Sequence, residues 1–335
     1  MSDIQGFATH AAGAQLVAFR YNPGELGPFD LEVRISHCGV CHSDLHLIDN
    51  DWGISRFPFI PGHEIVGTVT GLGSAVRGHT LGQRVGIGWQ ADSCGICEWC
   101  RSAQEHLCPR AQPTCVARHG GFADAVRVNS RFAVPLPDAL DSLSAAPLLC
   151  AGLTVYAPLR NLLVRPSSRV GIVGIGGLGH LGIQFARAFG AEVTALSTSR
   201  EKEPDALSFG AHAFVNTRDT TAVRKLAGSL DLILSTASAD LDFPGLLAAL
   251  RPKGNLVLLG APAKPMHLVG STLITTERAL TGSTSGSPSD LSEMLDVAAR
   301  HNIHAATEPF PMKDANTALT RLRKNQVRYR AVLTN

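Results

Sequence analysis

Four cysteines crowd into a short segment of the chain and could hold a metal ion. The segment reads CGICEWC from Cys94 through Cys97 to Cys100, and Cys108 follows after seven further residues. Zinc takes four thiolates in a tetrahedron, and two intervening residues allow successive cysteines to bind one ion. Because sulfur would fill every position, we expect a structural zinc here. Reduced buried thiols or disulfides are the alternative, and the crowding fits them less well in a reducing compartment.

A second set of possible ligands is scattered and would leave one zinc position open. Cys41 lies in the segment CGVCHSDLH, His63 in PGHE, and Cys150 at the expected junction of two domains, hence at a cleft. Each is weak alone, since a single buried cysteine usually behaves as a small apolar residue. Together they form a Cys₂His set, whose fourth position accepts water or an alcohol oxygen. Zinc there lowers the pKa of a bound alcohol and polarises a carbonyl group.

A glycine-rich turn predicts a dinucleotide site. The letters GIGGLG follow a predicted strand over residues 169–173 and open a predicted helix over 178–189, with another strand following at 192–196. Such glycines permit a tight turn and allow the backbone to approach a pyrophosphate at the helix N-terminus. The residues expected to bind the cofactor are Gly174, Gly176, Gly177, Leu178 and Gly179. The alternative is a packing turn that binds nothing.

The end of the second strand indicates which dinucleotide is bound. An NAD site places Asp or Glu there, on the ribose 2′-hydroxyl. This chain reads LSTSREK from residue 196 and has no acid at that position. We therefore expect NADP(H), with hydroxyl groups and positive charges around the 2′-phosphate: Ser197, Thr198, Ser199, Arg200 and Lys202. A solvated, charged helix start is the alternative.

The elements that would position these residues fall into two regions. Up to about residue 150, short apolar runs at 31–35, 65–69, 85–87 and 125–128 predict a β-rich domain. After a predicted helix at 148–161, strands and helices alternate, which favours a parallel, doubly wound sheet. Its strands are expected at 169–173, 192–196, 213–215, 230–234, 255–259 and 279–282, with helices at 178–189 and 243–250.

The end of the chain is expected to return to the first domain. Small polar residues at 286–289 indicate a break, after which a helix over 289–300, capped by Ser289, and a strand over 330–333 are predicted.

Composition limits the classes of partner. The chain has 335 residues, which suggests two domains, and its 44% apolar and 17% charged content is typical of a globular protein. The net charge is +2 without a basic block, so nucleic acid is not an expected partner. Residues 1–13 lack the layout of a signal peptide, and the apolar region at 170–191 is interrupted by glycines, His180 and Arg187. We expect a cytoplasmic protein that does not bind a membrane.

Taken in order, the motifs resemble one known family. GVCHSDLH, PGHE, the four-cysteine segment, HGGFAD, PLLCAGLTVY and GIGGLGHLG follow one another along essentially the whole chain. They resemble the zinc-containing medium-chain alcohol dehydrogenases, most closely the cinnamyl alcohol dehydrogenases and microbial NADPH-dependent aldehyde reductases. The resemblance implies an α/β protein with a GroES-like catalytic domain at 1–150 and 287–335 and a Rossmann NADP(H)-binding domain at 151–286. It also implies a homodimer or homotetramer.

The resemblance assigns roles to individual residues. Cys41, His63 and Cys150 match the catalytic zinc ligands. Glu64 matches an acidic residue that can approach the metal, and Asp44 one that orients the ligand histidine. The remaining matches are Ser43, which takes the substrate proton, His46, which passes it to solvent, His42 near the pyrophosphate, Thr154 near the nicotinamide, and Trp52 and Trp89 in the substrate pocket. Core packing is the alternative for both tryptophans.

The implied activity is hydride transfer between NADP(H) and primary alcohols or aldehydes of aromatic, allylic or medium-chain type, with reduction as the working direction. A non-catalytic zinc- and NADPH-binding sensor would be expected to lose Ser43, His46 or a ligand. A zinc-free quinone reductase would lack the Cys and His ligands. A polyol dehydrogenase would usually have a carboxylate in place of Cys150, and a ribose acid.

Overall fold

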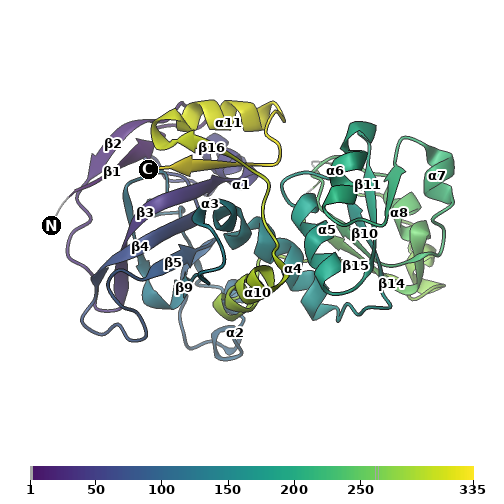
Figure 1. Ribbon diagram of the computed structural model, residues 1–335, viewed down its shortest axis with the longest axis horizontal. Helices are drawn as coiled ribbons and strands as arrows, with labels where there is room; N and C mark the ends of the chain where they lie inside the picture. The colour runs from purple at the N-terminus through teal and green to yellow at the C-terminus, as the bar shows by residue number, and fades with distance from the viewer. Residues whose placement is uncertain (1–2, 261, 263) are drawn as a thin grey trace. The chain divides into compact units, whose positions relative to one another are not determined.

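The computed structural model describes residues 3–260, 262 and 264–335, and its two compact units are considered separately (Figure 1). One unit combines Met1–Cys150 with Ser285–Asn335, and we call it the discontinuous unit. The other is Ala151–Thr284, the continuous unit.

The discontinuous unit is built on a seven-stranded sheet in the order β16-β17-β3-β4-β5-β9, with β8 paired to β3. All of its pairs are antiparallel except β16 with β17. The strands are β3 (Asp30–Val40), β4 (Glu64–Leu72), β5 (Arg84–Ile87), β8 (Ala125–Asn129), β9 (Ala133–Pro135), β16 (Thr307–Pro311) and β17 (Arg330–Thr334). Alternate residues of β3, such as Leu31, Val33 and Ile35, face one apolar core.

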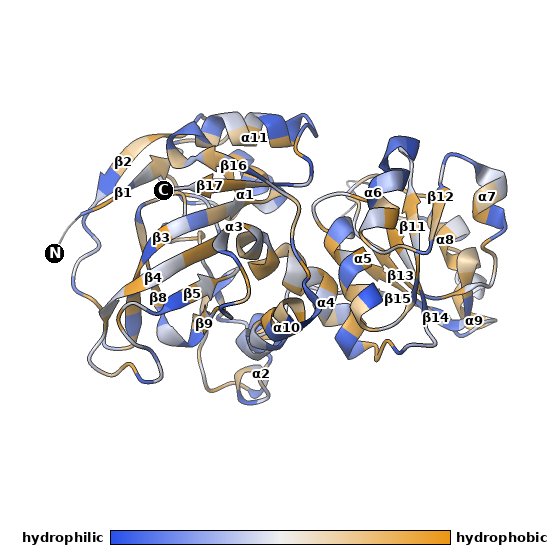
Figure 2. Ribbon diagram, in the orientation of Figure 1, coloured by the Kyte–Doolittle hydropathy of each residue, from blue (hydrophilic) through white to orange (hydrophobic). Residues whose placement is uncertain are grey.

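Shorter elements surround this sheet. Two small antiparallel pairs are β1 (Ile4–Ala8) with β2 (Val17–Tyr21), and β6 (Gln90–Asp92) with β7 (Gln112–Pro113). The helices are α1 (His42–Asp49), α2 (Glu98–Arg101), η1 (Glu105–Leu107), η2 (Ser130–Phe132), α3 (Ser142–Ala145), η3 (Ala146–Leu149), α10 (Pro288–His301), η5 (Met312–Asp314) and α11 (Ala315–Arg323). The buried residues of α10 recur at helical spacing, and its ribbon has an apolar and a polar face (Figure 2).

The pairing of β3 with β4 brings two distant segments together. The strands are antiparallel, and Gly39 near the end of β3 lies opposite Glu64 at the start of β4. Residues that follow β3 and residues that precede β4 therefore lie beside each other. Cys41 and His63 are those residues, so the register of one strand pair places both.

The continuous unit contains a six-stranded sheet in the order β12-β11-β10-β13-β14-β15, with every pair parallel. Its strands are β10 (Arg169–Val173), β11 (Glu192–Ser197), β12 (Ala213–Asn216), β13 (Leu230–Ser235), β14 (Leu250–Leu258) and β15 (Ala279–Gly282). Its helices are α4 (Ala151–Asn161), α5 (Gly179–Ala188), η4 (Arg200–Lys202), α6 (Glu203–Ser208), α7 (Thr220–Arg224), α8 (Phe243–Ala249) and α9 (Ser271–Ile274). The strand order reverses beside β10, which is where doubly wound sheets bind ligands.

Two sequence predictions about helices were wrong. The helix expected over 148–161 is two helices, because the chain leaves helical geometry at Cys150 (φ −123°, ψ −69°), after a 3₁₀ turn that contains Pro147. The helix expected to be capped by Ser289 begins at Pro288. Its N-cap is Ser287, whose hydroxyl accepts from the Asp290 N–H while the Asp290 carboxylate accepts from the Ser287 N–H.

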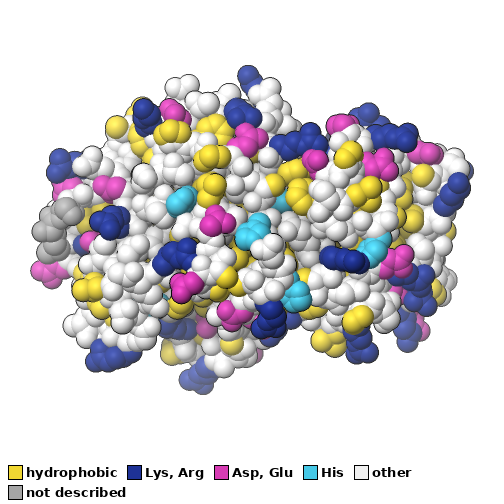
Figure 3. Space-filling view, in the orientation of Figure 1, with side chains coloured by type: hydrophobic (Ala, Val, Ile, Leu, Met, Phe, Trp, Pro, Cys, Tyr) yellow, Lys and Arg dark blue, Asp and Glu magenta, His cyan; other side chains and the backbone are white. Residues whose placement is uncertain are grey.

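Among the described residues, no single helix is long and apolar enough to cross a membrane, and only the bent pair Ser142–Leu149 and Ala151–Asn161 passes that test by length and composition. On the face drawn in Figure 3, Lys and Arg side chains are interspersed with Asp and Glu.

Candidate active site and metal centres

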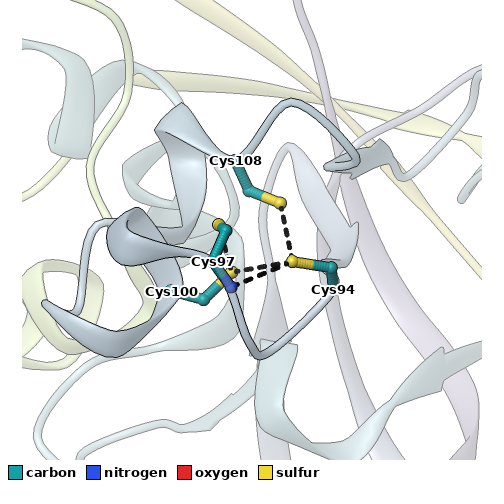
Figure 4. Close-up of side chains that lie close together, drawn as sticks. All are labelled: Cys94, Cys97, Cys100 and Cys108. Carbon is teal, nitrogen blue, oxygen red and sulfur yellow. Dashed lines mark hydrogen bonds between the residues drawn. The ribbon is translucent and has the colours of Figure 1, made fainter.

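The four clustered cysteines converge on one point (Figure 4). The sulfur of Cys108 lies 3.6 Å from that of Cys94, Cys97 lies 3.6 Å from Cys100, and Cys94 lies 3.9 Å from Cys100. Four Zn–S bonds of about 2.3 Å give a tetrahedron whose edges are about 3.8 Å. The sulfurs are too far apart for a disulfide. The geometry therefore fits a zinc ion with no open position.

Backbone groups favour thiolates at this site. The N–H groups of Ile96 and Cys97 lower the pKa of Cys94 to about 5. The N–H of Arg110 donates to the Cys108 sulfur at 3.4 Å. Because a thiolate, not a thiol, binds metal, these donors prepare the site for a cation.

The scattered ligand candidates also converge, entirely within the discontinuous unit. Ligand atoms of Cys41, His63, Glu64 and Cys150 all lie within 4.8 Å of one another. Cys41 follows β3, His63 precedes β4, and Cys150 follows η3. The Nε2 atom of His63 lies 3.4 Å from the Cys150 sulfur. A hydrogen bond with Cys150 lowers the pKa of Cys41 well below its ordinary value.

Asp44 fixes the orientation of His63. One carboxylate oxygen lies 2.9 Å from Nδ1 of His63 and accepts from the Gly62 N–H at 3.1 Å, while the other accepts from the Cys41 N–H at 2.8 Å. Asp44 and His63 are both fully buried. A proton held on Nδ1 leaves Nε2 unprotonated, so its lone pair is available to a metal ion on the side of the two sulfurs. Two thiols and this nitrogen fit a zinc ion with its fourth position open.

Glu64 lies beside these donors and is paired with Arg330 of β17. Both side chains are buried, and burial raises the pKa of Glu64 to about 7 while the Arg330 guanidinium opposes that shift. Oε2 of Glu64 has no hydrogen-bond partner among the described residues. Gly39 makes room for it, since a Cβ there would lie 1.9 Å from Oε2. Sequence reasoning missed Arg330, although a charge in the apolar strand RAVLT was a visible signal.

Two further predicted residues lie on α1. The Ser43 hydroxyl is 3.7 Å from the Cys41 sulfur. His46 is partly exposed, and its Nδ1 lies 2.7 Å from the carboxylate of Asp51, which sequence reasoning did not single out. His42, the first residue of α1, has an exposed side chain, and desolvation by the surrounding protein lowers its pKa. The helix therefore carries a hydroxyl beside the thiol and an imidazole that reaches solvent.

The two predicted pocket tryptophans lie near the same donors. Trp52 stacks on His46 at 5.2 Å between ring centroids, and Trp89 meets the ring of His63 edge-on at 4.9 Å. Trp52 and Trp89 contact each other at 6.1 Å. Trp52 is 44% exposed, which argues against simple core packing for that residue.

The glycine-rich turn of the continuous unit has the geometry of a dinucleotide loop. Gly174 has φ +88°, and a Cβ on Gly179 would lie 1.9 Å from the Gly174 carbonyl oxygen. A Cβ on Gly176 would meet no atom within 4 Å, so space remains for a ligand against that backbone. Leu178 is the N-cap of α5, after Gly177. The loop fits a pyrophosphate at the helix N-terminus.

The residues expected around the 2′-phosphate lie after β11. Ser197 is buried at the strand end, and its hydroxyl accepts from the Ser199 N–H at 3.2 Å. The Arg200 side chain is 83% exposed. Lys202 donates to the Ile175 carbonyl at 2.8 Å, which links it to the glycine-rich turn. Thr198 separates the two serines, and Thr154 lies on α4 of the same unit.

Comparison with known proteins identifies the family. Residues 27–138 match the alcohol dehydrogenase GroES-like domain, and residues 177–300 match the zinc-binding dehydrogenase domain. An aldehyde reductase of Synechocystis sp. is 40% identical, and the alignment covers 99% of each chain. The chain belongs to the zinc-containing medium-chain alcohol dehydrogenases. This confirms the predicted GroES-like and Rossmann folds, and places the dehydrogenase in the group of cinnamyl alcohol dehydrogenases and aldehyde reductases.

Solved structures agree. A cinnamyl alcohol dehydrogenase of Sorghum bicolor has a TM-score of 0.95 at 39% identity, covering 99% of this chain and 98% of that one. CAD of Helicobacter pylori, solved in complex with NADP(H), has a TM-score of 0.92 at 30% identity, with 99% and 98% covered. This alcohol dehydrogenase is an oxidoreductase that interconverts alcohols and aldehydes and uses zinc.

Proposed function

We propose that this dehydrogenase uses NADP(H) and acts on primary alcohols and aldehydes of aromatic, allylic or medium-chain type, with reduction as its working direction. The end of β11 supports the cofactor choice: Ser197 occupies the position where an acid would repel a 2′-phosphate. Arg200 and Lys202 follow within one short helix and supply positive charge. The NADP(H) complex of the Helicobacter relative supports the same choice.

We propose Cys41, His63 and Cys150 as the catalytic zinc ligands and the four clustered cysteines as the structural ones. When bound, zinc supplies a Lewis acid and NADPH supplies hydride. Asp44 holds the His63 tautomer that leaves Nε2 free. Ser43 donates the proton that the reduced product requires, and His46, held by Asp51, restores it from solvent. Glu64 adds an acidic oxygen beside the ligands.

The two tryptophans support the proposed substrate class. Trp52 and Trp89 present aromatic surface beside His63 and leave Trp52 partly accessible. Flat or extended apolar substrates would bury that surface, whereas a polyol would leave its hydroxyl groups against it without partners.

We further propose residues 1–150 and 287–335 as the catalytic domain and 151–286 as the cofactor domain of a cytoplasmic homodimer or homotetramer. His42 would lie near the pyrophosphate and Thr154 near the nicotinamide. Among the described residues no strand pairs with the outer side of edge strand β15, which supports self-association by sheet extension. Exposed Val269 and Ile274 lie shortly before that strand in the chain.

A substrate and cofactor panel tests the proposal. We expect kcat/KM with NADPH to exceed that with NADH. In reduction with NADPH, benzylic and cinnamyl aldehydes should have a higher kcat/KM than short aliphatic aldehydes, and in oxidation with NADP+ the corresponding alcohols should have a higher kcat/KM than mannitol. Ser197→Asp should reverse the cofactor preference, because a carboxylate repels the 2′-phosphate and binds the 2′-hydroxyl. Ser197→Ala is the matched control and should keep the preference for NADPH. Equal kcat/KM with both cofactors in the unmodified enzyme would refute the cofactor assignment.

A further inference from the structure

The loop that carries His63 is held by a separate segment, residues 119–122, which we call the clasp. Three clasp N–H groups donate to this loop: Gly120 to the Ile60 carbonyl at 2.7 Å, Phe122 to Pro61 at 2.9 Å, and Gly121 to Gly62 at 2.8 Å. A Cβ on Gly120 would lie 2.4 Å from the Gly62 carbonyl oxygen, so the approach is close. The loop's three carbonyls are thus bonded to backbone that cannot titrate.

One bond of the clasp runs in the opposite direction and uses a side chain. The Ile60 N–H donates to Nδ1 of His119 at 3.3 Å. Ile60 is fully buried, and Pro61 has no N–H. The Gly62 N–H is already taken by Asp44. His119 is therefore the acceptor for the amide three residues before His63, and it can accept only while Nδ1 is unprotonated.

The surroundings of the His119 ring favour that neutral state. The ring packs against Tyr21 at 4.2 Å and Phe19 at 5.4 Å between centroids. Burial lowers the pKa of His119, with no charged group contributing to the shift. Titratable groups near the ring among the described residues include the Tyr21 phenol, which contacts it, the guanidinium of the preceding residue Arg118, and His10, whose ring meets Phe19 edge-on.

We propose that His119 is a positioning residue: its unprotonated Nδ1 holds the His63 loop in place, and protonation at acid pH releases that hold. The inference deepens the proposed function, because it takes His63 as a zinc ligand. The bond is intact at neutral pH and is lost as the pH falls below about 6.5, the ordinary His value, because the folded pKa lies below that value.

Two substitutions separate the acceptor from the ring. His119→Phe keeps aromatic packing on Tyr21 but removes the acceptor at every pH. His119→Asn keeps an acceptor, since Asn Oδ1 occupies the place of Nδ1, and it cannot titrate. His119→Leu is a second acceptor-free variant in case the phenylalanine does not fold.

Amide hydrogen exchange of the zinc-loaded enzyme is the first measurement. Fragments that share an N-terminus upstream of Phe57 and end at Phe59 or at Ile60 differ only in the Ile60 amide, so subtraction resolves the Ile60 signal. At pH 7.5 we expect exchange at Ile60 about tenfold faster in His119→Phe than in the unmodified enzyme, and unchanged in His119→Asn. Equal exchange in all three proteins would overturn the proposal whatever the enzyme's substrate is, so this readout is independent of the proposed function.

Zinc release to a chelator between pH 8 and pH 5 is the second measurement. Protonation of the zinc ligands accelerates zinc release in every variant. The informative quantity is therefore the rate constant of zinc release from the unmodified enzyme divided by that from His119→Asn. We expect a ratio near one above pH 7 that rises several-fold below pH 6.5, with His119→Phe fast throughout and the Kd for NADPH unchanged. A constant ratio across this range would overturn the pH-dependent hold.

Discussion

The two cysteine-containing clusters use the same sulfur chemistry and differ in what completes them. The Cys94–Cys108 cluster supplies four sulfurs from one short segment, and its thiolates are stabilised by nearby backbone N–H groups. The Cys41–His63–Cys150 cluster draws two sulfurs and a nitrogen from three separate segments. In the first cluster, the fourth sulfur fills the last coordination position, so the site can only hold the segment together. In the second, the missing donor leaves an open position, and buried Asp44, Glu64 and Arg330 must organise its surroundings.

The largest expected effect tests whether the Cys41–His63–Cys150 cluster is the catalytic one. Cys41→Ser should lower kcat/KM on the order of 10⁴-fold, because the Lewis acid contributes several kcal/mol to the transition state. Zinc content, measured by atomic absorption, should fall from two ions per chain to one. Cys38→Ser, which changes a buried thiol outside both clusters, is the control and should keep both ions. Unchanged turnover in Cys41→Ser would contradict the assignment.

The next largest effect concerns the buried ion pair beside the open cluster. Arg330→Ala leaves Glu64 buried without its partner and should cost about 3–5 kcal/mol in the free energy of unfolding. Urea unfolding monitored by tryptophan fluorescence measures this. The double variant Glu64→Gln with Arg330→Met removes both charges and should regain much of the loss. If the single variant unfolds at the same urea concentration as the unmodified enzyme, the pair does not stabilise the fold.

A change in the closed cluster should affect stability more than chemistry. Cys97→Ser should release one zinc ion and lower the free energy of unfolding by about 3 kcal/mol, because metal binding by this segment is coupled to its folding. Turnover at low temperature should persist, since the open cluster is intact. A large loss of kcat with unchanged unfolding would mean that the two clusters do not divide structural and catalytic work as proposed.

The smallest effect tests how strongly the open cluster depends on its surroundings. Asp44→Asn should weaken zinc binding or activity 10- to 100-fold, because the amide cannot accept from His63, Cys41 and Gly62 as the carboxylate does. Competition with a chelator measures the zinc Kd. Asp49→Asn on the same helix is the control, since its partner is the partly exposed Arg323. Identical zinc affinity in both variants would show that Asp44 does not support zinc binding at the open cluster.

Local patterns predicted most of the continuous unit well. The apolar run of β10 was predicted at its observed bounds, because this strand is almost completely buried within a parallel sheet. β15 was also predicted at its observed bounds, although this edge strand is exposed or half-buried. In the discontinuous unit, strand pairing extended an element beyond its apolar run: β3 was predicted at 31–35 but runs to Val40, since β17 and β4 pair with its less regular end. The break in the helix at Cys150 and the N-cap at Ser287 each depend on one or two residues, and the spacing of apolar residues does not reveal them.

Spacing could not reveal the partners that come from far along the chain. The cysteine segment was readable because its ligands are local. Arg330 lies 266 residues from Glu64, and His119 lies 59 residues from Ile60. The residues around each partner give no indication of the other partner. Such pairs can therefore be recognised only when the three-dimensional structure is known. The roles of the individual site residues stay predictions until the variants above are measured.

The position of β17 has a consequence for synthesis on the ribosome. Residues 151–284 are contiguous, so the continuous unit can fold as soon as they leave the exit tunnel. Strand β3 waits far longer, because its neighbour β17 is translated almost 300 residues after it. Until Arg330 emerges, Glu64 has no counter-ion. Nascent chains stalled just before this strand should therefore contain a finished Rossmann fold tethered to an unfinished metal site.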